Sequence, residues 1–79
     1  MEIKILGSGC ARCRSLEQAT KEAITELGLN ATVEKVEDIQ KIMEYGVMRT
    51  PGLIVDGKIV STGQVPSVKE LKTMLSSLQ

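Results

Sequence analysis

The residues most able to do chemistry are the only two cysteines of the chain, Cys10 and Cys13, in the stretch GSGCARC. Two thiols three positions apart on a helix lie close to the Cα separation that a disulfide tolerates. The loop that they would close is too short to restrict the unfolded chain strongly, so the pair is a poor structural staple. In a reducing cytosol such a pair is typical of a redox or metal site.

A redox role follows if Cys10 begins a helix. The free N–H groups and the dipole of the first helical turn would then stabilise its thiolate, and Arg12 and Arg14 would add positive charge. Cys10 would be the attacking nucleophile, with a pKa below the ordinary value of about 8.5. Cys13 would be the resolving thiol of a thiol–disulfide exchange.

Metal binding is the alternative reading of the same two thiols. A closed zinc site takes four ligands, and the chain offers two cysteines and no histidine. A two-thiolate site for Cu(I) or an arsenic-type metalloid stays open. Copper chaperones of the ferredoxin-like class also carry CxxC after their first strand, but Ser8 stands where they usually have Met. Their β-α-β-β-α-β order also differs from the order expected here.

The first half of the chain must position this pair. Residues 2–6 are expected to form a strand, and apolar residues at helical spacing predict a helix over residues 11–27 that ends at Gly28. Residues 31–36 alternate as a strand does. Asp38 is expected to cap a short helix that Gly46 closes. The apolar positions of the two helices are Leu16, Ala19, Ala23, Ile24 and Leu27 in the first, and Ile39, Ile42 and Met43 in the second.

The second half predicts a hairpin and a last helix. Leu53–Val55 and Lys58–Val60 flank Asp56-Gly57, a pair typical of two-residue hairpin turns. Ser67 and Glu70 match a capping box before an apolar stripe. The resulting order is β-α-β-α-β-β-α. It predicts one α/β domain over residues 1–79, with a four-stranded mixed sheet of order 2-1-3-4 and helices on both faces.

Thr50-Pro51 comes directly before the third strand and could simply end the preceding helix. Together with the upstream CxxC, it resembles the cis-proline element of the thioredoxin fold. GSGCARC, GVMRTPGLIVDGKIVSTGQVPS and the chain length resemble the small thioredoxin-like family of archaea and bacteria, whose members are redox-active disulfide proteins. The resemblance implies a minimal thioredoxin-like fold with a cis Thr50-Pro51 bond. It also implies a substrate groove formed by Thr50, Pro51 and Gly63.

The chain departs from typical thioredoxins at several positions. Gly9 replaces the usual Trp before the first cysteine, and Arg12 replaces the Pro of CGPC. Lys4 stands where typical thioredoxins carry a buried Asp, and Lys35 matches the lysine that pairs with that Asp. Lys4 and Lys35 are therefore expected to favour thiolates by charge, alongside the two arginines, without acting as the same base. The alternative for Lys4 is a side chain that only reaches solvent.

Composition excludes several other classes of function. Ten basic and ten acidic residues cancel, so no net charge attracts nucleic acid or an anionic membrane. No apolar run is long enough to span a bilayer, and no leader pattern begins the sequence. We therefore expect a cytoplasmic, monomeric disulfide oxidoreductase with no cofactor beyond its Cys10–Cys13 disulfide and no metal. The expected partners are protein disulfides as substrates, and a flavin-dependent thioredoxin reductase or a small thiol as electron donor.

Overall fold

The structure, a computed structural model, describes residues 1–7 and 11–78. Its elements follow the predicted order. They are β1 (Glu2–Leu6), α1 (Ala11–Leu27), β2 (Thr32–Val36), α2 (Ile39–Glu44), β3 (Gly52–Val55), β4 (Lys58–Thr62) and α3 (Val68–Ser77).

The four strands form one sheet in the order β2-β1-β3-β4, as predicted. β1 pairs parallel with β2, and β3 is antiparallel to both of its neighbours. The hairpin turn forms at Asp56-Gly57, where both residues have positive φ. β4 is longer than predicted and extends to Thr62, which pairs with Gly52 beyond an irregularity between Leu53 and Ile54 that shifts the register.

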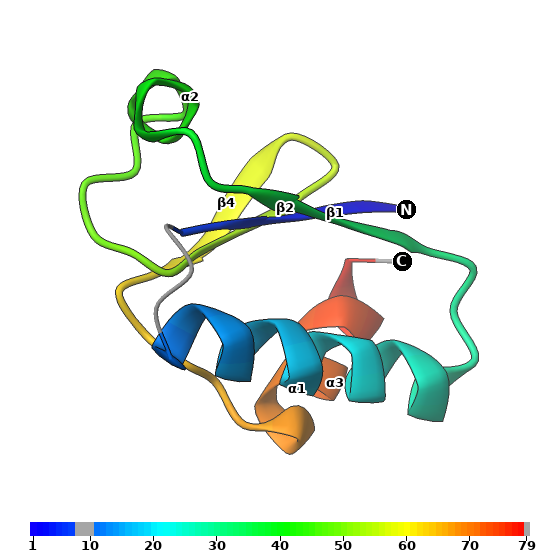
Figure 1. Ribbon diagram of the computed structural model, residues 1–79. Helices are drawn as coiled ribbons and strands as arrows, with labels where there is room; N and C mark the ends of the chain where they lie inside the picture. Colours follow the sequence, from blue (N-terminus) through cyan, green and yellow to red (C-terminus); the bar gives the residue numbers. More distant parts are fainter. Residues whose placement is uncertain (8–10, 79) are drawn as a thin grey trace.

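Helices cover both faces of the sheet: α1 and α3 lie on one, and α2 lies on the other (Figure 1). Alternation along β1 explains the division, because successive strand residues face opposite sides. Ile3 and Ile5 join the buried cluster of the α1–α3 face, and Leu6 joins that of the α2 face. The first cluster contains Ile3, Ile5, Leu16, Ala23, Leu53, Val55, Leu71 and Leu75. The second contains Leu6, Val36, Ile42, Val47 and Ile54.

Local signals fix the ends of the helices. α1 ends as predicted at Gly28, with hydrogen bonds from the Gly28 N–H to the Thr25 carbonyl and from the Leu29 N–H to the Ile24 carbonyl. This pair of bonds is the Schellman pattern. Asp38 caps α2 by accepting from the Gln40 N–H at 2.9 Å.

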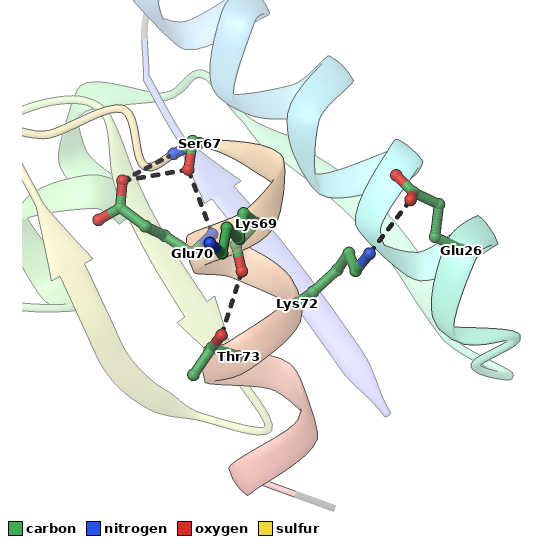
Figure 2. Close-up of polar contacts among 6 residues, drawn as sticks. All are labelled: Glu26, Ser67, Lys69, Glu70, Lys72 and Thr73. Carbon is green, nitrogen blue, oxygen red and sulfur yellow. Dashed lines mark hydrogen bonds and ion pairs between the residues drawn. The ribbon is translucent and has the colours of Figure 1, made fainter.

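The last helix begins with a cap and is linked to the first helix. The Ser67 hydroxyl accepts from the Glu70 N–H at 3.2 Å, and the Glu70 carboxylate accepts from the Ser67 N–H at 3.3 Å, which completes the predicted capping box of α3 (Figure 2). Further along α3, Lys72 Nζ lies 3.2 Å from Glu26 Oε1 on α1. The two helices therefore form one layer held by buried Leu residues and by this surface ion pair.

Candidate functional site

Three chain segments meet at one end of the sheet, where strands begin and end, and we call this region the site edge. There, β1 ends at Leu6 and leads toward α1, β3 begins at Gly52, and β4 ends at Thr62. Strand pairing aligns these ends, because Leu6 is opposite Gly52, and Gly52 is opposite Thr62. The site edge thus brings together the start of α1, the Thr50-Pro51 loop and the turn after β4, which are far apart in sequence.

Cys13 lies in the first turn of α1 and is only 5% exposed. It packs tightly under the end of β1, since a Cβ atom built on Gly7 would overlap the Cys13 Sγ. The Gly7 N–H donates to the Val36 carbonyl at 2.9 Å, which holds this glycine against β2. Gly7 therefore makes room for a thiol beneath the sheet edge, a role that its sequence position alone did not reveal.

Cys10 lies outside the described residues, so its nucleophilic role and lowered pKa stay predictions. Gly9 and Ser8 lie outside them as well. The burial of Cys13 agrees with the part predicted for it, because a resolving thiol attacks within the protein and needs no open path to solvent. The exposed start of α1 at Ala11 and Arg12 shows that the chain reaches the surface immediately before Cys13.

The Thr50-Pro51 peptide bond is cis, as predicted. Thr50 is exposed and Pro51 is buried, so the loop presents one residue to solvent and anchors the next. The Pro51 carbonyl accepts a hydrogen bond of 2.8 Å from the Gly63 N–H. Gly63 has a φ of +68°, in the region that glycine adopts without steric cost. The two predicted groove segments are thus directly joined.

Arg12 connects the start of α1 to the same turn. Its Nη2 donates to the Gly63 carbonyl at 2.7 Å. Gly63 therefore receives contacts from both sides, through its carbonyl from Arg12 and through its N–H to Pro51. Arg12 was predicted to tune thiol pKa values, which stays a prediction; the contact that the structure shows links α1 to the turn at Gly63. Arg14, predicted for the same role, is exposed in the first turn of α1.

The two predicted lysines face opposite sides of the sheet. Lys4 Nζ donates to the Tyr45 hydroxyl at 2.8 Å, next to α2, and lies 5.5 Å from the centre of the Tyr45 ring. Lys35 Nζ lies 3.6 Å from Glu17 Oε1 on α1. The alternative in which Lys4 only reaches solvent is therefore wrong, because Lys4 has a defined partner. The partner is the only aromatic residue of the chain, which the sequence analysis did not connect with the site.

The Tyr45 contact has an electrostatic consequence. The hydrogen bond from Lys4 to the Tyr45 hydroxyl, and after it the charge interaction with Tyr45, raise the pKa of Lys4 above its ordinary value. Lys4 is then a cation throughout the neutral range. It can favour nearby anions, but it cannot accept the proton that the buried Asp of typical thioredoxins takes.

A hollow lined by apolar residues lies beside Thr50, on the α2 side of the site edge. Three of its side chains are large and exposed: Met48 at 96%, Met43 at 69% and Ile39 at 65%. We call this surface the apolar hollow; its complete lining is Ile39, Ile42, Met43, Gly46, Val47, Met48 and Thr50. The helix pattern placed Ile39 and Met43 on the apolar side of α2, and the structure shows that only Ile42 of that set is buried.

In the part of the chain that the structure describes, no three Asp, Glu, Cys or His side chains gather as metal ligands. A site that used Cys10 would include a residue outside the described ranges. Over the same residues, no helix has both the length and the apolar character needed to cross a bilayer.

Comparisons with known proteins agree with this geometry. A family model described as a thioredoxin domain matches residues 1–76. A protein named thioredoxin from Methanothermobacter thermautotrophicus is 45% identical over 76 residues, which cover 96% of this chain and 99% of that protein. Another thioredoxin, from Methanocaldococcus jannaschii, is 43% identical over 75 residues, which cover 95% of this chain and 86% of the relative.

Proposed function

This chain belongs to the thioredoxin family and is a thiol–disulfide oxidoreductase, and from this premise we propose that it reduces protein disulfides with a Cys10/Cys13 couple. The carrying observation is the hydrogen-bonded connection from Arg12 through Gly63 to Pro51. It joins the helix that bears Cys13 to the cis-proline loop, which in this proposal binds the substrate chain.

The reaction has two exchange steps. The Cys10 thiolate attacks one sulfur of the substrate disulfide, forming a mixed disulfide and releasing the other substrate sulfur as a thiolate, which takes up a proton. Cys13, as a thiolate, then attacks Cys10 Sγ, forming the Cys10–Cys13 disulfide and releasing the second substrate thiolate. Two electrons pass from the protein to the substrate. A flavin-dependent reductase or a small thiol returns them.

The surroundings of Cys13 support this order of attack. Its sulfur is buried against Gly7, while Thr50 and Arg12 at the same edge are exposed. An external disulfide therefore meets the edge of the site before it can meet Cys13. The backbone N–H groups at the start of α1 would stabilise a thiolate at Cys10. The first N–H groups of a helix have no partner within the helix and can donate to the residue that precedes it.

The apolar hollow supports a protein as substrate rather than a small disulfide. Met48 and Met43 expose flexible side chains that adapt to different apolar partners. They lie on the same side as Thr50, so a polypeptide held at the Thr50-Pro51 loop could extend across them. This surface would take the place of the contact that the missing Trp before Cys10 supplies elsewhere in the family.

The proposal also covers the location of the protein, its oligomeric state and the charges near its thiols. We place the protein in the cytoplasm as a monomer without a bound cofactor, where the reducing surroundings would return its disulfide to the dithiol form. The charges of Lys4, Lys35, Arg12 and Arg14 would lower the thiol pKa values. The names of the relatives favour this function over a Cu(I) or arsenic-type carrier, and no residue contact of the described chain favours the carrier.

Insulin reduction with a dithiol donor tests the proposal. The protein should accelerate reduction catalytically, with and without added Cu(I) or Zn(II). Cys13→Ser should perform the first attack and accumulate as a covalent complex with its substrate on a non-reducing gel. Cys10→Ser should trap nothing. If neither variant traps a partner and both lose Cu(I) binding to the same extent, the two thiols are equivalent metal ligands and the protein is a carrier.

A further inference from the structure

All arginines of the chain lie around the site edge. Arg12 and Arg14 are in the first turn of α1, and Arg49 lies two residues before Pro51. Each is exposed. Every other basic residue of the chain is a lysine. Arginine presents a planar group of N–H donors that matches a carboxylate with two parallel hydrogen bonds, whereas lysine offers a point charge.

Two of these side chains converge on Gly63 from different elements. Arg12 reaches it from α1 through the 2.7 Å hydrogen bond to its carbonyl. The stem of Arg49 packs against the same residue, since a Cβ built on Gly63 would stand 3.1 Å from the Arg49 Cβ and 3.3 Å from its Cδ. Two arginine side chains, from α1 and from the loop before β3, therefore contact the same residue of the predicted substrate groove.

The positive charge of this pair is not neutralised by ion pairs within the described residues. There, the carboxylates within 4.0 Å of a basic group are those of Glu17 and Glu26, and their partners are lysines: Lys21, Lys35 and Lys72. The visible partner of Arg12 is an uncharged carbonyl, which leaves most of its N–H donors for a ligand.

Acidic residues at the same end of the sheet lie on its other side. Glu37 and Asp38 follow β2, which is separated from β3 and β4 by β1. The Asp38 carboxylate is already used as the cap of α2. The site edge is therefore basic on its β3–β4 side, although the chain as a whole has a formal net charge of zero.

We infer, on the basis of the proposed function, that Arg12 and Arg49 select protein disulfides flanked by acidic residues. An Asp or Glu beside the substrate cysteine would lie near Gly63 while the substrate backbone is held at the Thr50-Pro51 loop. Its carboxylate would accept charge-assisted hydrogen bonds from the two guanidinium groups. The same charges would also steer acidic substrates to the site edge during encounter, an effect that salt reduces.

The test uses the full chain, a dithiol donor and two synthetic disulfide peptides of identical length. One carries Glu on both sides of the reactive cysteine, and the other carries Gln there. We expect kcat/KM to be about tenfold higher for the Glu peptide at low salt, within the range of electrostatically steered association. The ratio should fall toward one at about 0.5 M salt, where the Debye length drops below the spacing of exposed charges.

Two variants that each remove one positive charge show whether the preference for the Glu peptide depends on Arg49. Arg49→Gln should reduce the ratio to about threefold or less, because one of the two guanidinium groups is lost. Lys58→Gln removes the same charge from the hairpin end of β4, away from the site edge, and should leave the ratio unchanged. Arg12→Gln does not isolate the effect of charge, because it also removes the hydrogen bond to the Gly63 carbonyl.

Each outcome decides a separate question. A ratio near one in the unmodified protein overturns this inference, while reduction of both peptides still supports the proposed function. Failure to reduce either peptide overturns the proposed function itself. An equal fall of the ratio in Arg49→Gln and Lys58→Gln shows that overall charge, and not the pair at Gly63, causes the preference, and it too overturns the inference.

Discussion

The Sγ atom of Cys13 occupies the space that a Cβ atom on Gly7 would need. Gly7→Ala should therefore force the end of β1 away from α1. Added atoms in a well-packed interior cost about 1–3 kcal/mol of unfolding free energy. Urea unfolding of the reduced protein would measure this loss, and thiol alkylation should show faster labelling of Cys13.

Gly28→Ala is a control for that experiment. Gly28 has a positive φ but no atom within 4 Å of a built Cβ, so this change should destabilise α1 at its far end only. The labelling rate of Cys13 in native conditions should then stay close to that of the unmodified protein. Equal labelling in Gly7→Ala and the unmodified protein would contradict the packing argument.

The two thiols should differ in acidity. Cys13 is buried at 5% exposure, and burial in apolar surroundings disfavours a thiolate. Cys10, which precedes α1, should have a pKa below about 8.5 and toward about 7. Iodoacetamide labelling of Cys10→Ser and Cys13→Ser across pH gives the pKa of each remaining thiol. Faster labelling of Cys13 at lower pH would reverse the assigned roles.

The Lys4–Tyr45 hydrogen bond should make a small contribution to stability that depends on pH. The pKa of Lys4 is raised in the folded protein. Its contribution is therefore fully present below the unfolded value of about 10.4 and is lost as pH rises through the folded value. Chemical unfolding between pH 8 and 11 should show a steeper loss of stability at the alkaline end for the unmodified protein than for Tyr45→Phe.

A double-mutant cycle measures the energetic coupling between the Lys4 and Tyr45 side chains. Lys4→Met keeps the phenol, Tyr45→Phe keeps the amine, and the double variant lacks both groups. If the two side chains act through their 2.8 Å hydrogen bond, the double variant should lose less than the sum of the single losses. Strict additivity at pH 8 would argue against an energetic coupling.

The apolar hollow should matter for protein substrates only. Met48→Gln removes, among the described residues, the most exposed large apolar side chain, at 96% exposure. We expect KM for insulin to rise several-fold, while kcat/KM for a small aromatic disulfide stays within about twofold. Leu78→Gln, an exposed apolar residue just beyond α3, is the matched control and should change neither value. A parallel loss for both substrates in Met48→Gln would point to damage at the site instead.

Much of the fold could be predicted because short-range signals agree with one another. Gly28 ends α1, Asp56-Gly57 makes the hairpin turn, and Ser67 with Glu70 begins α3, each through contacts among residues close in sequence. The strand order and the cis Thr50-Pro51 bond were also confirmed. The extension of β4 was missed because it depends on pairing of Thr62 with Gly52, a tertiary effect.

The contacts of the site were harder to predict than its segments. The bond from Arg12 to Gly63 spans 51 positions, and that from Lys4 to Tyr45 spans 41. No local pattern encodes such distant partners. Lys4 and Lys35 were treated together, yet the parallel register aligns Lys4 with Glu34 and Lys35 with Ile5, which sends the two lysines to opposite faces. Alternation along β1 and β2 predicts which face each lysine occupies, but only once the register between the two strands is known.

The unequal covering of the two sheet faces has a consequence for motion. The α1–α3 layer holds eight buried residues in its cluster, whereas the six-residue α2 shares a cluster of five. Because local opening begins where the least apolar area is buried, amide hydrogens of α2 should exchange with deuterium sooner than those of α1. The α2 side of the binding surface would then change its conformation to fit successive partners. The α1 side, which carries Cys13, would keep the same geometry from one turnover to the next.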